Sequence, residues 1–110
     1  MHPILQNNID AISALCKQHH VKELYAFGSV LRDDFNEASD IDLLAKFTLL
    51  PNIENLDDLK FYFENLDELR KLLKNIFRRN VDLLEEKNIK NNFLLNNINK
   101  EKQLLYAQAG

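Results

Sequence analysis

The chain has 110 residues, which is enough for one domain and too few for two. Its net charge of −3 argues against a general nucleic-acid-binding surface, and no apolar run is long enough to span a membrane. The first residues lack a basic segment followed by an apolar one, so we expect no signal peptide. A single cysteine excludes an intramolecular disulfide and favours a reducing cytoplasm.

Residues 4–19 have the pattern of an amphipathic helix. Apolar side chains recur there every three or four residues, at Leu5, Ile9, Ile12 and Cys16. We expect Cys16 to be a small buried apolar group. We expect His19 and His20 to be exposed residues at the helix end, where cations suit the helix dipole.

An apolar strand is predicted over residues 22–28, ending at Gly28-Ser29. A short helical turn over 30–35 and a loop over 36–39 follow, and the next strand covers 40–47. In that strand Asp40 and Asp42 alternate with Ile41 and Leu43. Because side chains on a strand change face at each residue, the two carboxylates share one face, roughly 7 Å apart along the strand. Ile41 and Leu43 then face the core.

The second half of the chain begins with a connection over residues 48–55. A helix is predicted over 56–77, with a start signal at Asn55 and an apolar stripe formed by Leu56, Leu59, Phe63, Leu66, Leu69, Leu73 and Ile76. Residues 80–85 are predicted to form a third strand, in which Asp82 lies between Val81 and Leu83. Residues 88–107 are predicted to form a last helix.

The acids around the second strand are crowded. Asp33, Asp34, Glu37, Asp40 and Asp42 lie within ten residues, and Arg32 is the only positive charge among them. A divalent cation would relieve this repulsion, and oxygen ligands without His or Cys favour Mg²⁺. Upstream, Gly28 permits close approach of the backbone to a ligand, and the helical turn opened by Ser29 suits a phosphate. A phosphate site beside metal-binding carboxylates indicates nucleotide chemistry.

Each of these features alone also fits a plainer interpretation. Gly28-Ser29 is compatible with an ordinary strand-to-helix turn, and Asp40 and Asp42 with a solvated strand face. Asp82 fits a solvent-facing residue as well as a third member of the acidic site. It is the combination of an apolar strand, the Gly-Ser turn, a fixed gap and the alternating acids that favours a functional site.

The combined motif carries a resemblance to a known family. Gly28-Ser29, ten intervening residues and Asp40-Ile41-Asp42 resemble the signature of the polymerase-beta-type nucleotidyltransferase superfamily, and the fuller string is similar to its minimal, single-lobe members. Arg78-Arg79-Asn80-Val81-Asp82-Leu83 is similar to the context of the superfamily's third acid. The resemblance implies an α/β (α+β) fold, with a small mixed sheet, helices packed on one side and an open acidic face.

The resemblance also implies an enzyme that uses ATP and Mg²⁺, with two metal ions. The implied catalytic residues and metal ligands are the three acids Asp40, Asp42 and Asp82, and the implied nucleotide-binding residues are Gly28, Ser29 and Arg32. Asp82 would also help to deprotonate the acceptor hydroxyl. For Arg32 a second interpretation stays open, in which it only balances Asp33 and Asp34.

The small members of the superfamily are usually the antitoxin half of a pair with a helical toxin of the HEPN ribonuclease family. We expect no second, acceptor-binding domain in 110 residues, so the resemblance implies that a partner protein brings the acceptor. The implied reaction places AMP from ATP on a tyrosine of the cognate HEPN toxin. Two alternatives stay open: an antitoxin that neutralises its partner by binding alone, and a nucleotidyltransferase that modifies a small molecule of the aminoglycoside type.

Overall fold

One four-stranded mixed sheet organises the protein. The computed structural model describes residues 1–48, 52 and 54–109. The strands are β1 (Val21–Phe27), β2 (Ile41–Phe47), β3 (Val81–Glu85) and β4 (Gln103–Ala107), in the order β3-β2-β1-β4. Strand β1 is antiparallel to β2 and β4, whereas β2 and β3 are parallel. The small mixed sheet predicted from the sequence is confirmed.

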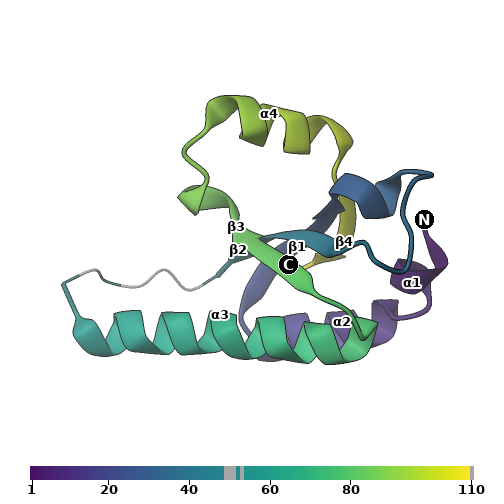
Figure 1. The fold of residues 1–110 in the computed structure, drawn as a ribbon. Coiled ribbons are helices and arrows are strands. Elements are labelled where there is room, and N and C mark those ends of the chain that lie inside the picture. The colour runs from purple at the N-terminus through teal and green to yellow at the C-terminus, as the bar shows by residue number, and fades with distance from the viewer. Residues whose placement is uncertain (49–51, 53, 110) are drawn as a thin grey trace.

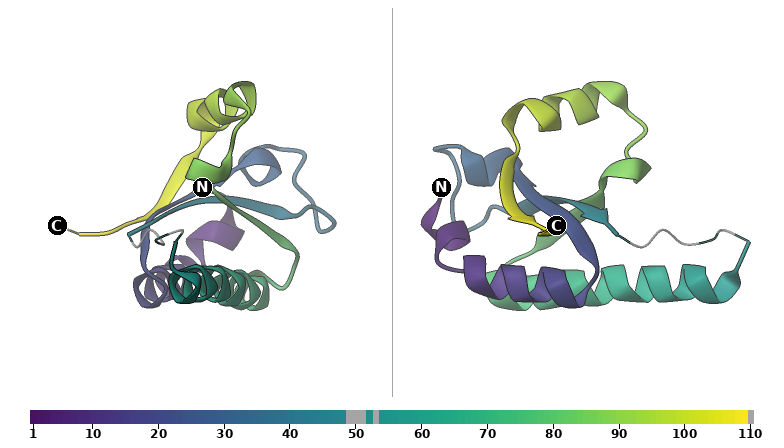
Figure 2. Two further views of the ribbon diagram at one scale, coloured as in Figure 1. Left: turned by 90° about the vertical axis from the view of Figure 1, so that its left-hand side faces the viewer. Right: turned by 180° about the vertical axis from the view of Figure 1, so that it is seen from behind.

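Two helices cover one face of the sheet. Helices α2 (Ile9–Gln18) and α3 (Leu56–Phe77) lie side by side below the strands (Figures 1 and 2). A parallel strand pair needs a crossover connection, and α3 provides it between β2 and β3. Alternation along β2 turns Ile41 and Leu43 toward these helices, and both are fully buried, as predicted.

Helix α4 (Asn92–Glu101) lies on the opposite side of the sheet (Figure 2), so the expectation that the helices pack on one side holds for α2 and α3 but not for α4. It is near the short helix η1 (Gly28–Leu31), and a second short helix, η2 (Glu86–Asn88), precedes it in the chain. Ile98 of α4 is buried, whereas Phe93 is 77% exposed. Helix α4 therefore uses a narrow apolar stripe and leaves much of its surface open.

The predicted helix over residues 4–19 is broken into two. Helix α1 (Pro3–Gln6) ends at Asn7, and α2 begins at Ile9. The Asn8 side chain donates a hydrogen bond to the carbonyl oxygen of Ile4 at 2.7 Å, and such local side-chain bonds compete with the helical ladder. The apolar stripe survives the break, because its members Leu5, Ile12 and Cys16 are all fully buried.

The prediction that His19 is exposed is wrong. Only 7% of His19 is accessible, because α3 packs beside the end of α2. Its Nδ1 donates to Oδ1 of Asn65 at 3.0 Å, and Nδ2 of Asn65 donates to the His19 carbonyl oxygen at 2.7 Å. Asn65 thus links the two helices.

The prediction that the last helix continues to residue 107 is also wrong. Helix α4 ends at Glu101, and residues 103–107 form strand β4 beside β1. The run Leu104-Leu105-Tyr106 is too short to distinguish helix from strand by its periodicity. This run forms a strand because β1 has a free edge, and pairing there satisfies the backbone hydrogen-bonding groups of both strands.

Helix α3 has the predicted bounds, and the Asn55 side chain caps it by accepting from the backbone N–H groups of Asp57 and Asp58. The predicted stripe is buried only in its second half. Leu73 is fully buried, whereas Leu56 is 80% exposed. In Figure 1 the first half of α3 extends past the edge of the sheet. The predicted connection over 48–55 lies partly outside the described residues.

None of the helices in the described part of the chain has the length and hydrophobicity that a bilayer span requires.

The uneven burial of α3 predicts unequal effects for one and the same substitution. We expect Leu73→Ala to lower the free energy of unfolding by about 2–5 kcal/mol, because it leaves a cavity in the core. We expect Leu56→Ala to change it by less than about 0.5 kcal/mol, because little apolar surface is lost. Urea unfolding of both variants checks this, and comparable losses would show that the first half of α3 is covered in solution.

Candidate active site

Two acids face each other across the parallel strands. In the register of β2 and β3, Asp42 pairs with Asp82. Residues opposite each other on neighbouring strands point to the same face and are separated by about 4.8 Å. Asp40 lies immediately before β2, two residues from Asp42, and is exposed. The structure therefore brings Asp42 and Asp82 together and places Asp40 next to them.

The turn after β1 closes against Asp42. Phe27 pairs with Asp42 in the antiparallel register, so Gly28 directly follows that position. Gly28 has a φ of +75°, and a Cβ atom there would lie 2.5 Å from Oδ2 of Asp42. Only glycine tolerates both the left-handed backbone and the close contact, because it has no side chain. The backbone can therefore lie directly against the Asp42 carboxylate.

Ionisation of the Asp42 carboxyl is unfavourable in the folded protein. Burial raises the pKa of the Asp42 carboxyl above its ordinary value, and the nearby negative charges of Asp82 and Asp40 raise it further. Arg32 opposes this effect. A cation beside Asp42 would relieve the repulsion, so the donor set fits a hard metal ion. Among residues 1–48, 52 and 54–109, however, no three His, Cys, Asp or Glu side chains form a ready-made metal cluster.

Arg32 pairs with an acid that the sequence analysis did not single out. Its Nη2 lies 3.1 Å from Oε1 and 3.2 Å from Oε2 of Glu101, the last residue of α4. Oε1 of Glu101 also accepts from the backbone N–H of Gly28 at 3.3 Å. The interpretation that Arg32 balances Asp33 and Asp34 is thus replaced by an ion pair with Glu101. Nothing in the sequence near Glu101 signals this contact, because it depends on β4 pairing with β1.

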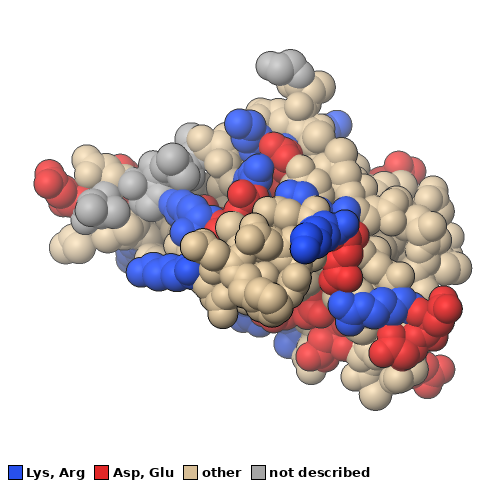
Figure 3. All heavy atoms as spheres, turned by 90° about the horizontal axis from the view of Figure 1, so that it is seen from above, with Lys and Arg blue, Asp and Glu red and all other residues tan. Residues whose placement is uncertain are grey.

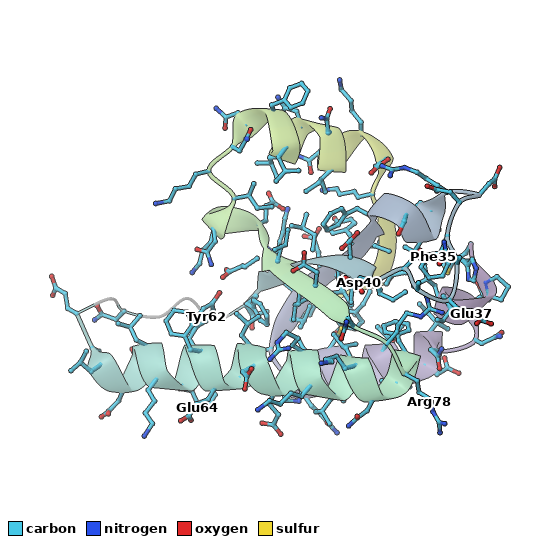
Figure 4. The ribbon with its side chains drawn as sticks, viewed as in Figure 1. Phe35, Glu37, Asp40, Tyr62, Glu64 and Arg78 are labelled. Atoms are coloured by element: carbon cyan, nitrogen blue, oxygen red, sulfur yellow. The ribbon has the colours of Figure 1, made fainter. Side chains whose placement is uncertain are left out.

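The loop that leads to Asp40 is held by Arg79. Its Nη1 donates to the carbonyl oxygens of Asn36 and Ser39, both at 2.9 Å, and its guanidinium lies 4.7 Å from the centre of the Phe35 ring. Figure 4 shows Asp40 near this loop, at the end of the sheet where α3 finishes. Arg79 therefore stabilises the loop next to the acidic patch, the group formed by Asp40, Asp42 and Asp82.

A polar hollow of about 450 Å³ lies beside Asp40, and Lys74, Arg78 and Glu37 contribute to its walls. On the face seen from the α4 side, basic and acidic side chains are interleaved (Figure 3). This face is therefore not uniformly basic.

Comparison with known proteins identifies the family. The profile described as "Nucleotidyltransferase domain" matches residues 9–105. The chain belongs to this family. A nucleotidyltransferase relative from Methanocaldococcus jannaschii, named "Putative protein adenylyltransferase MJ0128", is 35% identical over 93 residues, which cover 84% of this chain and 83% of the relative.

Solved structures share the nucleotidyltransferase fold. One, described as "Structure of putative minimal nucleotidyltransferase", superposes with a TM-score of 0.69 and 24% identity over 90% of both chains. Another is a tri-AMPylated Shewanella oneidensis HEPN toxin in complex with MNT antitoxin, with a TM-score of 0.62 and 20% identity over 94% of this chain and 73% of that one. The predicted polymerase-beta-like nucleotidyltransferase fold is confirmed.

The close approach of Gly28 to Asp42 predicts an energetic coupling between them. We expect Gly28→Ala to lower the free energy of unfolding by at least about 1–2 kcal/mol, because a left-handed backbone disfavours a side chain. The contact between the added Cβ and the carboxylate adds to this loss. In an Asp42→Ala background that second part disappears, so the loss should be smaller. A double-mutant cycle by urea unfolding measures the difference, and equal losses in both backgrounds would contradict the geometry.

The raised pKa of Asp42 predicts that replacing this residue by a neutral one increases the free energy of unfolding, by an amount that depends on pH. The unfolded carboxyl titrates near 3.8, whereas the folded one holds its proton to higher pH, so stability is lost as the pH rises through this interval. Asp42→Asn cannot ionise and should be more stable than the unchanged protein at pH 7, with the gain shrinking toward pH 3. Urea unfolding across this range checks the trend. Asp58→Asn, an exposed acid on α3, controls for net charge, and a gain independent of pH would contradict the prediction.

Proposed function

We propose that this protein is a magnesium-dependent adenylyltransferase that moves AMP from ATP to a hydroxyl group of a partner protein. The observation that carries the proposal is the pairing of Asp42 with Asp82 beside the turn at Gly28. This arrangement puts clustered carboxylates next to the backbone turn at Gly28 and Ser29 within a nucleotidyltransferase domain. The relative named as a protein adenylyltransferase supports a protein as the acceptor.

The acids Asp40, Asp42 and Asp82 would hold two Mg²⁺ ions. Magnesium is commonly bound by one or two carboxylates together with substrate phosphates and water, so a complete protein cluster is not required. When bound, magnesium neutralises charge on the phosphates and makes a hydroxyl more acidic. The raised pKa of Asp42 supports this role, because a cation would stabilise its ionised form.

The turn at the end of β1 would hold the phosphates. Gly28 and Ser29 would present backbone N–H groups and the Ser29 hydroxyl to the β- and γ-phosphates. Arg32 would add a guanidinium, which pairs well with phosphate oxygens. Both features lie beside Asp42, so the triphosphate and the acids would share one site.

The transfer itself would be a substitution at the α-phosphate. The acceptor oxygen forms a bond to the α-phosphorus, and the bond between that phosphorus and the bridging oxygen to the β-phosphate breaks. Pyrophosphate leaves with the electron pair of the broken bond. Asp82, which is exposed beside Asp42, would accept the proton of the acceptor hydroxyl.

The acceptor that best fits this proposal is a tyrosine of a cognate HEPN-family toxin. The related structure of an AMPylated HEPN toxin with an MNT antitoxin supports this choice. The proposal makes the protein an antitoxin by adenylylation and locates it in the cytoplasm, where ATP is available. It also predicts that a small helical HEPN-family protein is encoded next to this chain.

The acids should be required for transfer but not for complex formation. We expect Asp40→Asn/Asp42→Asn to abolish incorporation of AMP from α-labelled ATP into that HEPN-family protein, and Asp82→Asn to reduce it by about 10²–10⁴-fold. Co-elution of the two proteins should be unchanged. Asp58→Asn is the matched control, since Asp58 is an exposed acid away from the paired strands.

Other outcomes of the same assay separate the alternatives. If Asp40→Asn/Asp42→Asn neutralises the toxin as well as the unchanged protein does, the antitoxin acts by binding alone. If AMP is incorporated into an aminoglycoside in the absence of any protein acceptor, a small-molecule transferase is the better description. Both results would contradict the proposed function.

A further inference from the structure

We propose that Glu101 sets the affinity for nucleotide by occupying, in the free protein, the position of a phosphate oxygen. This inference rests on the proposed function, because it concerns the same Gly28 and Arg32 that would hold the triphosphate. Glu101 would be an internal competitor, and ATP would have to displace its carboxylate. Removing the carboxylate should therefore strengthen ATP binding.

The contacts of Glu101 are those expected of a bound phosphate. Its Oε1 accepts from the backbone N–H of Gly28 at 3.3 Å and from Nη2 of Arg32 at 3.1 Å, and its Oε2 lies 3.2 Å from the same nitrogen. Backbone N–H groups at turns and guanidinium groups bind carboxylates and phosphates through the same geometry. A triphosphate at this turn would need the same donors, so it and Glu101 cannot use them together.

The sheet register brings Glu101 to the turn. Strands β1 and β4 are antiparallel, with Ala26 opposite Gln103. Gly28 lies two residues after Ala26, just past the end of β1, and Glu101 lies two residues before Gln103, at the end of α4, which contacts η1. The main chain of Glu101 is therefore fixed beside Gly28, whatever its side chain does.

The side chain of Glu101 can nevertheless leave. It is 37% exposed, and that of Arg32 is 54% exposed, so a change of rotamer moves the carboxylate into solvent without disturbing β4. Exposed ion pairs are weak, because water and salt screen them. The contact therefore tunes ATP binding without preventing it.

The experiment measures nucleotide binding without an acceptor. We compare the unchanged protein, Glu101→Gln and Glu101→Ala by calorimetry, using Mg²⁺ with α,β-methylene-ATP, whose α–β bridge cannot be cleaved. The Kd should fall by about two- to fivefold in both variants, the range set by a weak exposed ion pair. Adenosine, which has no phosphate, should bind all three proteins equally. Glu68→Gln, an exposed glutamate on α3, is the charge-matched control and should leave the Kd unchanged.

Weaker binding of the analogue to both variants would overturn the inference, because Glu101 would then only position Arg32. An unchanged Kd would overturn it as well. These results leave the proposed transfer reaction intact, since that is measured separately by AMP incorporation. Conversely, tighter binding to the variants without AMP transfer to any acceptor would support the role of Glu101 and contradict the proposed function.

Discussion

The parallel pairing of β2 with β3 is the constraint on which the acidic patch depends. It fixes Asp42 opposite Asp82, and a shift of one residue would turn one of the two carboxylates to the other face. The pairing is stabilised from the other face of the sheet, because alternation along β2 buries Ile41 and Leu43 in the core between the sheet and helices α2 and α3. Apolar burial on one face thus fixes the position of charge on the other.

The second constraint comes from β1, which pairs with both of its neighbours. Its register with β2 brings Gly28 against Asp42, and its register with β4 brings Glu101 against Gly28. One glycine therefore lies between two carboxylates. Arg32 contacts Glu101 directly and partly opposes the rise in the pKa of Asp42, so one cation acts on both acids. Moving any of the three strands would alter this charge balance.

Local patterns in the sequence predicted the parts of the fold that local chemistry decides. The bounds of α3 follow from its Asn55 cap and its long apolar period, and the strand at 40–47 follows from alternation. Strand β4 could not be predicted, since Leu104-Leu105-Tyr106 becomes a strand only because β1 offers an edge. The role of Glu101 at the turn was missed for the same reason. The burial of His19 likewise depends on Asn65, which is 46 residues away.

The two faces of the sheet contribute differently to stability. Their separation explains how the protein tolerates the repulsion between its acidic side chains. The face under α2 and α3 contributes apolar burial, whereas the face with Asp42 and Asp82 concentrates like charges. Charge crowded in this way lowers stability unless a counter-ion is present, and such crowding is typical of binding sites. Because the cost falls on residues outside the core, the site can stay charged while the fold remains intact. Ligand binding that neutralises the acids would then also stabilise the protein.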